Sequence, residues 1–76
     1  MPMRLLPVSD TAFEEVYHDF KDNPASTIRD VVSRTGWSIG TVTNVTLHLR
    51  NEGAIKRSRN EKGYFVFTII PSPLDG

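Results

Sequence analysis

The stretch that decides the fold is residues 26–53, STIRDVVSRTGWSIGTVTNVTLHLRNEG. Ser26 or Thr27 can cap a helix whose apolar residues recur at helical spacing. That helix should end at Gly36, because glycine readily adopts the left-handed conformation of a C-terminal cap. One residue later, Ser38 can cap another helix. Two helices joined by so short a turn must cross steeply, so the pattern predicts a helix-turn-helix.

The second helix of this motif, expected from about residue 39 to residue 52, has two distinct faces. Its inward face carries apolar residues and one threonine at helical spacing: Ile39, Val42, Val45, Thr46 and Leu49. Its outward face has at its centre Gly40, Asn44, Leu47 and Asn51, with Thr41, Thr43 and His48 beside them. The outward face therefore carries mostly short polar side chains, and Leu47 is its one large apolar residue.

The flanking segments supply a further helix before the motif and a hairpin after it. Ser9, Asp10 and Thr11 supply the chemistry of a helix start, and Thr11 with Glu14 has capping-box spacing. One helical face follows at Phe13, Val16, Tyr17 and Phe20. Pro24 should end this helix. Downstream, residues 54–58 and 64–70 have the composition of strands around a turn that contains glycine.

The order of these elements predicts a small α+β winged helix-turn-helix, with three helices and a C-terminal β-hairpin as the wing. The 76 residues are expected to form one domain, with residues 1–8 as an N-terminal extension and residues 71–76 as a flexible tail. A chain this short buries only about 60–65% of its unfolded surface, so a second copy would help to stabilise it. A homodimer is expected for that reason.

The segment from Thr41 to Ile55 resembles the recognition-helix region of bacterial winged-helix repressors of the MarR and GntR kinds. Those proteins often show a Thr-Val pair, a later leucine, then a charged residue, a glycine and an aliphatic residue that leads into the wing. The matching residues here are Thr41, Val42, Leu49, Glu52, Gly53 and Ile55. The resemblance implies a DNA-binding transcriptional regulator, and it extends to no effector domain.

Charge is unevenly distributed along a chain whose formal net charge is zero. Residues 1–28 hold two basic and five acidic side chains, whereas residues 29–62 hold seven basic and three acidic ones. Such segregation favours one basic and one acidic face, and a basic face suits nucleic acid.

Candidate DNA contacts follow from the chemistry of the major groove and of phosphate. Short polar side chains can approach base edges, an asparagine can pair with adenine, and unpaired amides at helix starts suit phosphate. The candidates on and before the helices are Thr27, Arg34, Ser38, Gly40, Thr41, Thr43, Asn44 and His48. The wing adds Arg57, Arg59 and Lys62 as phosphate contacts. Each group also has a simpler interpretation. The threonines and asparagine can form an ordinary solvated helix face, and His48 can be a surface histidine. The wing charges can serve only to keep an edge strand soluble.

Leu47 supports a competing hypothesis. Either the wing or a second protomer covers this leucine, or the outward face binds a protein instead of DNA. The absence of arginine and lysine between Ile39 and Leu49 agrees with the second reading, because arginine is the commonest reader of guanine. The alternative function is thus a winged-helix protein–protein interaction module with little or no DNA binding.

Catalysis and cofactors are not expected. The chain has no cysteine, no phosphate-binding glycine loop and two histidines, His18 and His48, on different predicted helices. Glu15, His18 and Asp19 share one side of the first helix, so a weak metal site stays open beside the simpler reading of a solvated face. No apolar run reaches the length of a membrane span, and a cytoplasmic protein without a membrane partner is expected.

Overall fold

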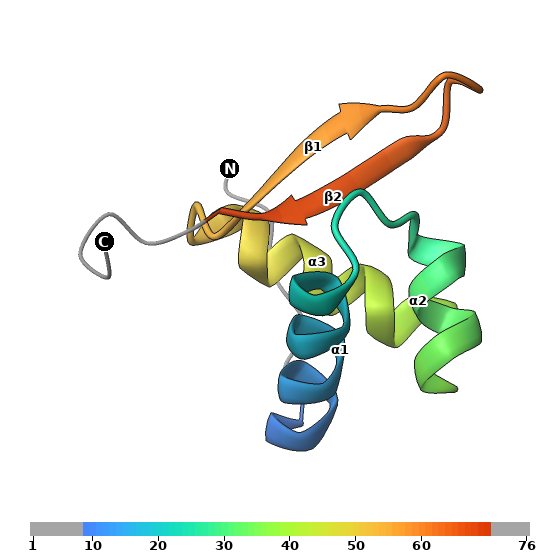
Figure 1. Cartoon of the computed structure of the whole chain (residues 1–76). Coiled ribbons are helices and arrows are strands. Elements are labelled where there is room, and N and C mark those ends of the chain that lie inside the picture. Colours follow the sequence, from blue (N-terminus) through green and yellow to red (C-terminus); the bar gives the residue numbers. More distant parts are fainter. Residues whose placement is uncertain (1–8, 71–76) are drawn as a thin grey trace.

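The computed structural model describes residues 9–70 and shows three helices followed by an antiparallel hairpin (Figure 1). The elements are α1 (Asp10–Asp22), α2 (Ile28–Thr35), α3 (Ile39–Asn51), β1 (Ile55–Arg59) and β2 (Phe65–Ile69). The hairpin lies to one side of the helices, with its turn beyond the start of α2 (Figure 1). This is the predicted α+β winged helix-turn-helix. The predicted extension 1–8 and tail 71–76 lie outside the described residues.

The start of α1 lies in the predicted stretch from Ser9 to Thr11, but Thr11 is not the cap. Ser9 is the cap, and its Oγ accepts a hydrogen bond from the Ala12 backbone N–H at 3.1 Å. Thr11 already lies inside the helix, so the expected capping box of Thr11 with Glu14 is wrong. Ser9 takes the cap because its backbone is extended there, with ψ at 148°.

The caps of the helix-turn-helix are those expected from its sequence. Thr27 and Asp30 form a reciprocal capping box at the start of α2, with hydrogen bonds of 3.0 and 3.1 Å. Gly36 ends α2 in the left-handed region at φ +80°. Ser38 begins α3, where its Oγ accepts from the Thr41 N–H at 3.2 Å. Local chemistry therefore sets both ends of the turn.

The core joins all three helices to the hairpin. Its buried members are Val16, Phe20, Val31, Val42, Val45, Leu49, Ile55 and Phe67. Phe20 of α1 and Phe67 of β2 meet edge to face, with ring centroids 5.9 Å apart. The wing is thus fastened to the helices by its own apolar base, while its turn extends away from the core.

A backbone bridge that the sequence pattern does not reveal also fastens the wing. Ser26, in the loop between α1 and α2, pairs with Phe67 in antiparallel fashion. The Phe67 N–H donates to the Ser26 carbonyl at 2.8 Å, and the Ser26 N–H donates back at 3.3 Å. The bridge places the start of α2 beside β2.

The same loop contains a strained residue that yields a stability prediction. Ala25 has φ +59°, in the left-handed region that alanine disfavours by about 1–2 kcal/mol. Ala25→Gly should relieve that strain but adds freedom to the unfolded chain, so we expect a net stabilisation of about 0.5 kcal/mol. The thermal midpoint should rise by about 2–4 °C. Ala25→Val is the control and should lower the midpoint; a fall with glycine would contradict the assigned backbone conformation.

Candidate nucleic-acid interface

The outward face of α3 is the first part of the candidate interface. Gly40, Thr43 and Asn51 are exposed, as predicted, whereas Thr41 is half-buried. Ile39 was expected to face inward, and that prediction is wrong, because its side chain is 58% exposed. As the first residue of α3, it lies at the edge of the apolar stripe and beyond the buried cluster.

Arg50 is a functional candidate that the sequence reasoning missed. It is exposed near the end of α3, seven residues after Thr43, and so lies two turns along the same face. This spacing was the signal that could have identified it. The helix therefore carries a cation on its outward face after all, although away from the N-terminal half that would approach bases.

Three residues near the centre of the predicted outward face are less open than expected. Asn44, Leu47 and His48 are half-buried. Their neighbours Val45, Thr46 and Leu49 are buried, so the accessible arc of α3 is narrower than the sequence pattern indicated. Leu47 in particular is not among the large apolar side chains that the described residues expose.

The two helix starts differ in their suitability for phosphate. At α2 the Asp30 carboxylate accepts from the Thr27 N–H, so a negative charge already occupies that end. The first turn of α3 contains no acidic residue, and the Ser38 hydroxyl donates to Thr41 Oγ1 at 3.0 Å. The start of α3 is electrostatically the better phosphate seat of the two.

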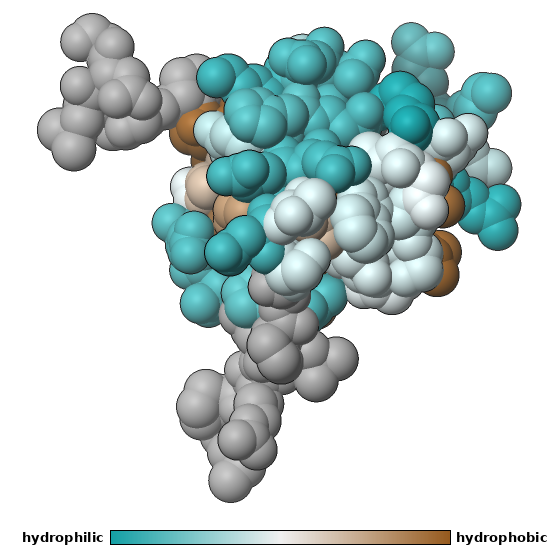
Figure 2. All heavy atoms as spheres, turned by 90° about the horizontal axis from the view of Figure 1, so that it is seen from below, coloured by the Kyte–Doolittle hydropathy of each residue, from teal (hydrophilic) through white to brown (hydrophobic). Residues whose placement is uncertain are grey.

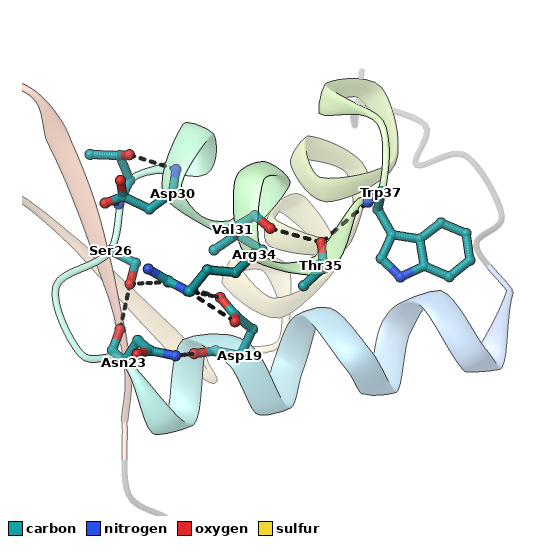
Figure 3. A network of polar contacts seen from close by, with 9 residues as sticks. Asp19, Asn23, Ser26, Asp30, Val31, Arg34, Thr35 and Trp37 are labelled. Carbon is teal, nitrogen blue, oxygen red and sulfur yellow. Dashed lines mark hydrogen bonds and ion pairs between the residues drawn. The ribbon is translucent and has the colours of Figure 1, made fainter.

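Arg34 contributes to the fold rather than to the wing surface (Figure 3). Its guanidinium makes a bidentate ion pair with Asp19, 2.8 Å at its shortest, and donates to Ser26 Oγ at 2.6 Å. The hydrogen bonds that Arg34 donates to the Asp19 carboxylate raise the pKa of Arg34, so the cation persists at every working pH. The Arg34 guanidinium thus links α2 to α1 and to the loop between them. Because it is already engaged in these contacts, we no longer assign it a phosphate contact.

The wing carries Arg57 and Arg59 on the same face. Side chains alternate along a strand, and the register pairs Arg57 with Phe67 and Arg59 with Phe65. At the base of the hairpin this face is the buried one, since Phe67 belongs to the core. Towards the turn it becomes exposed, and both guanidiniums lie over the Phe65 ring, 4.3 and 4.8 Å from its centroid.

The turn of the wing is ordered by one side chain. Asn60 Oδ1 accepts from the backbone N–H groups of Lys62 and Tyr64, at 2.9 and 3.0 Å. Gly63 completes the turn with φ +84°, a conformation that glycine adopts without strain. Lys62 is therefore presented from a defined backbone rather than from a loose loop.

An open groove separates the wing from the first turn of α2. Its walls combine exposed aromatic side chains with charges of both signs. The lining residues are Thr27, Ile28, Arg29, Asp30, Arg59, Asn60, Glu61, Lys62, Tyr64, Phe65 and Phe67. Three of them are cations and two are carboxylates. In residues 9–70 the ion pair present is Arg34–Asp19, so none of the groove's cations is neutralised by a described carboxylate.

Two of the α1 side chains considered above as possible metal ligands have other partners. Glu15 accepts a hydrogen bond from the Trp37 indole N–H at 3.2 Å, and Asp19 holds Arg34. Within the described part of the chain, no cluster of three or more His, Cys, Asp or Glu side chains could hold a metal ion. Nor is any described helix long and apolar enough to cross a membrane.

Comparison with known proteins identifies the fold. No protein-family model matches the chain, and no curated protein sequence does. Among solved structures, a zinc-bound manganese uptake regulator is similar, with a TM-score of 0.72 and 15% sequence identity over 88% of this chain. The chain spans 55% of that protein's length. The likeness supports a winged helix-turn-helix, but it does not point to the MarR or GntR kinds in particular.

Proposed function

We propose that this chain binds double-stranded DNA as a small transcriptional regulator. In this proposal α3 enters the major groove and the wing holds the backbone, with specific or semi-specific recognition of sequence. The observation that carries it is the exposed polar and basic face of α3 followed directly by a wing whose arginines lack a described carboxylate partner. The solved structure with the same fold is itself a regulator.

Base reading would fall to the N-terminal half of α3. Gly40 allows close approach, and Thr43 presents a hydroxyl and a methyl group from an exposed position. Ile39 adds an exposed apolar side chain that suits a thymine methyl group. Such contacts discriminate weakly by comparison with arginine, so we expect modest specificity and strong dependence on phosphate contacts.

Sequence recognition can be tested by selection from a random pool of duplexes. Selection at two salt concentrations should enrich a short motif, and Thr43→Ala should relax the preference at one or two positions while keeping nonspecific affinity. An Asp22→Ala variant, altered on α1, is the control and should enrich the same motif. Retention of no duplex at low salt would overturn the proposal.

The proposal includes a homodimer acting in the cytoplasm and no catalytic role. Two copies would match a roughly palindromic site, as two-fold symmetric winged-helix proteins do. The chain lacks cysteine, and its histidines stand on different helices, His18 on α1 and His48 on α3. Within residues 9–70, no set of side chains therefore suggests a nucleophile with its base.

An interaction module is the second candidate, and exposed apolar side chains favour it. Ile39, Tyr64 and Ile70 are 58%, 61% and 41% exposed. Against it, the face seen from below in Figure 2 is divided between hydrophilic residues and residues of intermediate hydropathy, and its hydrophobic residues form small separate patches. Protein interfaces usually need a larger continuous apolar centre than such patches offer.

Leu47→Asp separates the two functions. A carboxylate on α3 should repel phosphate, so we expect duplex affinity to fall at least tenfold while self-association is unchanged. Sedimentation measures association, circular dichroism checks helix content, and Leu47→Asn controls for the loss of the leucine. Abolished association with intact helix content would favour the interaction module instead.

A further inference from the structure

Arg57 and Arg59 of the wing both pack over one exposed aromatic ring, that of Phe65. Phe65 is 42% exposed, and the guanidinium carbons of Arg57 and Arg59 lie 4.3 and 4.8 Å from its centroid. Arginine side chains have large rotamer freedom, which must be lost when they bind phosphate. A ring that already holds both guanidiniums reduces that loss on binding.

The ring also sits at the edge of the groove between the wing and α2. Phe65, Arg59 and Lys62 line one wall, and Arg29 lines the other from the first turn of α2. The groove also contains two carboxylates. Asp30 keeps its negative charge in the capping box at the start of α2, and Glu61 lies in the turn of the wing. The three cations of the groove outnumber these two carboxylates.

We propose that this groove seats one phosphodiester strand and that Phe65 is the positioning residue of a two-arginine clamp at its edge. The inference rests on the proposed function and adds to it the strand's location and the residue that orients the clamp. Arg29 would contact the strand from the opposite wall. The ligand chemistry is a run of backbone phosphates, to which bidentate guanidiniums are well suited.

A double-mutant cycle tests the positioning role. Affinity for a fluorescently labelled duplex would be measured with the wild-type chain, Phe65→Leu, Arg57→Ala with Arg59→Ala, and the triple variant. Phe65→Leu should weaken binding about fivefold in the wild-type background, consistent with the strength of two exposed cation–π contacts. It should have no effect once both arginines are gone, and the slope of affinity against salt should not change, because no charge is removed.

Controls keep this test decisive. Phe65→Tyr retains a ring and should bind within twofold of wild type, with a thermal midpoint close to that of Phe65→Leu. An equal loss from Phe65→Leu in both backgrounds, or no loss in either, would overturn the clamp. If the wild-type chain bound no duplex at any salt concentration, the proposed function itself would be wrong. Failure of the clamp alone is different, because the wild-type chain would then still bind duplex.

The groove itself is tested from its other wall. Arg29→Ala should lower the salt slope by about one, the value for one phosphate contact. Lys56→Ala is the matched control, because Lys56 lies on β1 directly before Arg57 and on the opposite face of the hairpin. If Arg29→Ala and Lys56→Ala gave the same salt slope, the proposal that a strand lies in this groove would be wrong.

Discussion

Replacing Phe20 by alanine is expected to remove about 4 kcal/mol of folding free energy. Phe20 is fully buried in α1, and its ring meets Phe67 of β2 edge to face. The cavity would open where the first helix, the wing base and the helix-turn-helix meet. A domain of this size is stable by only about 5–10 kcal/mol, so about half or more of its stability would be lost.

Urea unfolding followed by circular dichroism measures this effect. Phe65→Ala is the matched control, since the same side chain is removed at a position that is 42% exposed. We expect about 1 kcal/mol of destabilisation there, because less apolar area leaves water on folding. Similar losses at the two positions would contradict the placement of the core.

The second large effect is expected on binding. Arg57→Ala with Arg59→Ala should weaken duplex affinity roughly 30-fold at low salt, at about 1 kcal/mol for each phosphate contact. The slope of log affinity against log salt should fall by about two. The loss should be similar for all duplex sequences, because phosphate contacts carry no base information.

Lys56→Ala is the control for this double variant as well. It removes a cation from the same strand but from the other face of the hairpin. We expect a change of less than twofold. If Lys56→Ala weakened affinity as much as the loss of either arginine, general electrostatic attraction to the wing would explain binding. The face that carries Arg57 and Arg59 would then have no special role.

Local chemistry made much of this fold predictable. The capping residues Thr27 and Ser38 and the glycine at 36 act on neighbours within four residues, so their roles are readable from the sequence. The hairpin was predicted to within one residue at either strand, because its composition and turn are likewise local. The alternation of side chains then follows from the register.

Long-range contacts account for what could not be predicted. Arg34 reaches Asp19 fifteen residues away, and Ser26 pairs with Phe67 across the chain. Neither leaves a periodic signal in the sequence. The exposure of Ile39 likewise depends on where the core ends, which a helical pattern does not define at its first residue.

The candidate interface was predictable in residue type but not in detail. The wing cations were expected and are exposed, whereas Arg34 is engaged within the fold and Arg50 was not among the expected contacts. The position of Phe65 under two guanidiniums could not have been inferred, because a strand phenylalanine is usually read as core. Only the pairing register brings it beneath two arginines.

The central claim is that the chain binds duplex DNA through phosphate contacts, and the salt dependence of wild-type affinity tests it most directly. Five exposed cations can contribute: Arg29, Arg50, Arg57, Arg59 and Lys62. Fluorescence anisotropy on one labelled duplex, from about 50 to 200 mM salt, should give a slope of about −4.5 on the logarithmic plot if all five contact phosphate. No measurable binding at the lowest salt, or a slope near zero, would contradict the account.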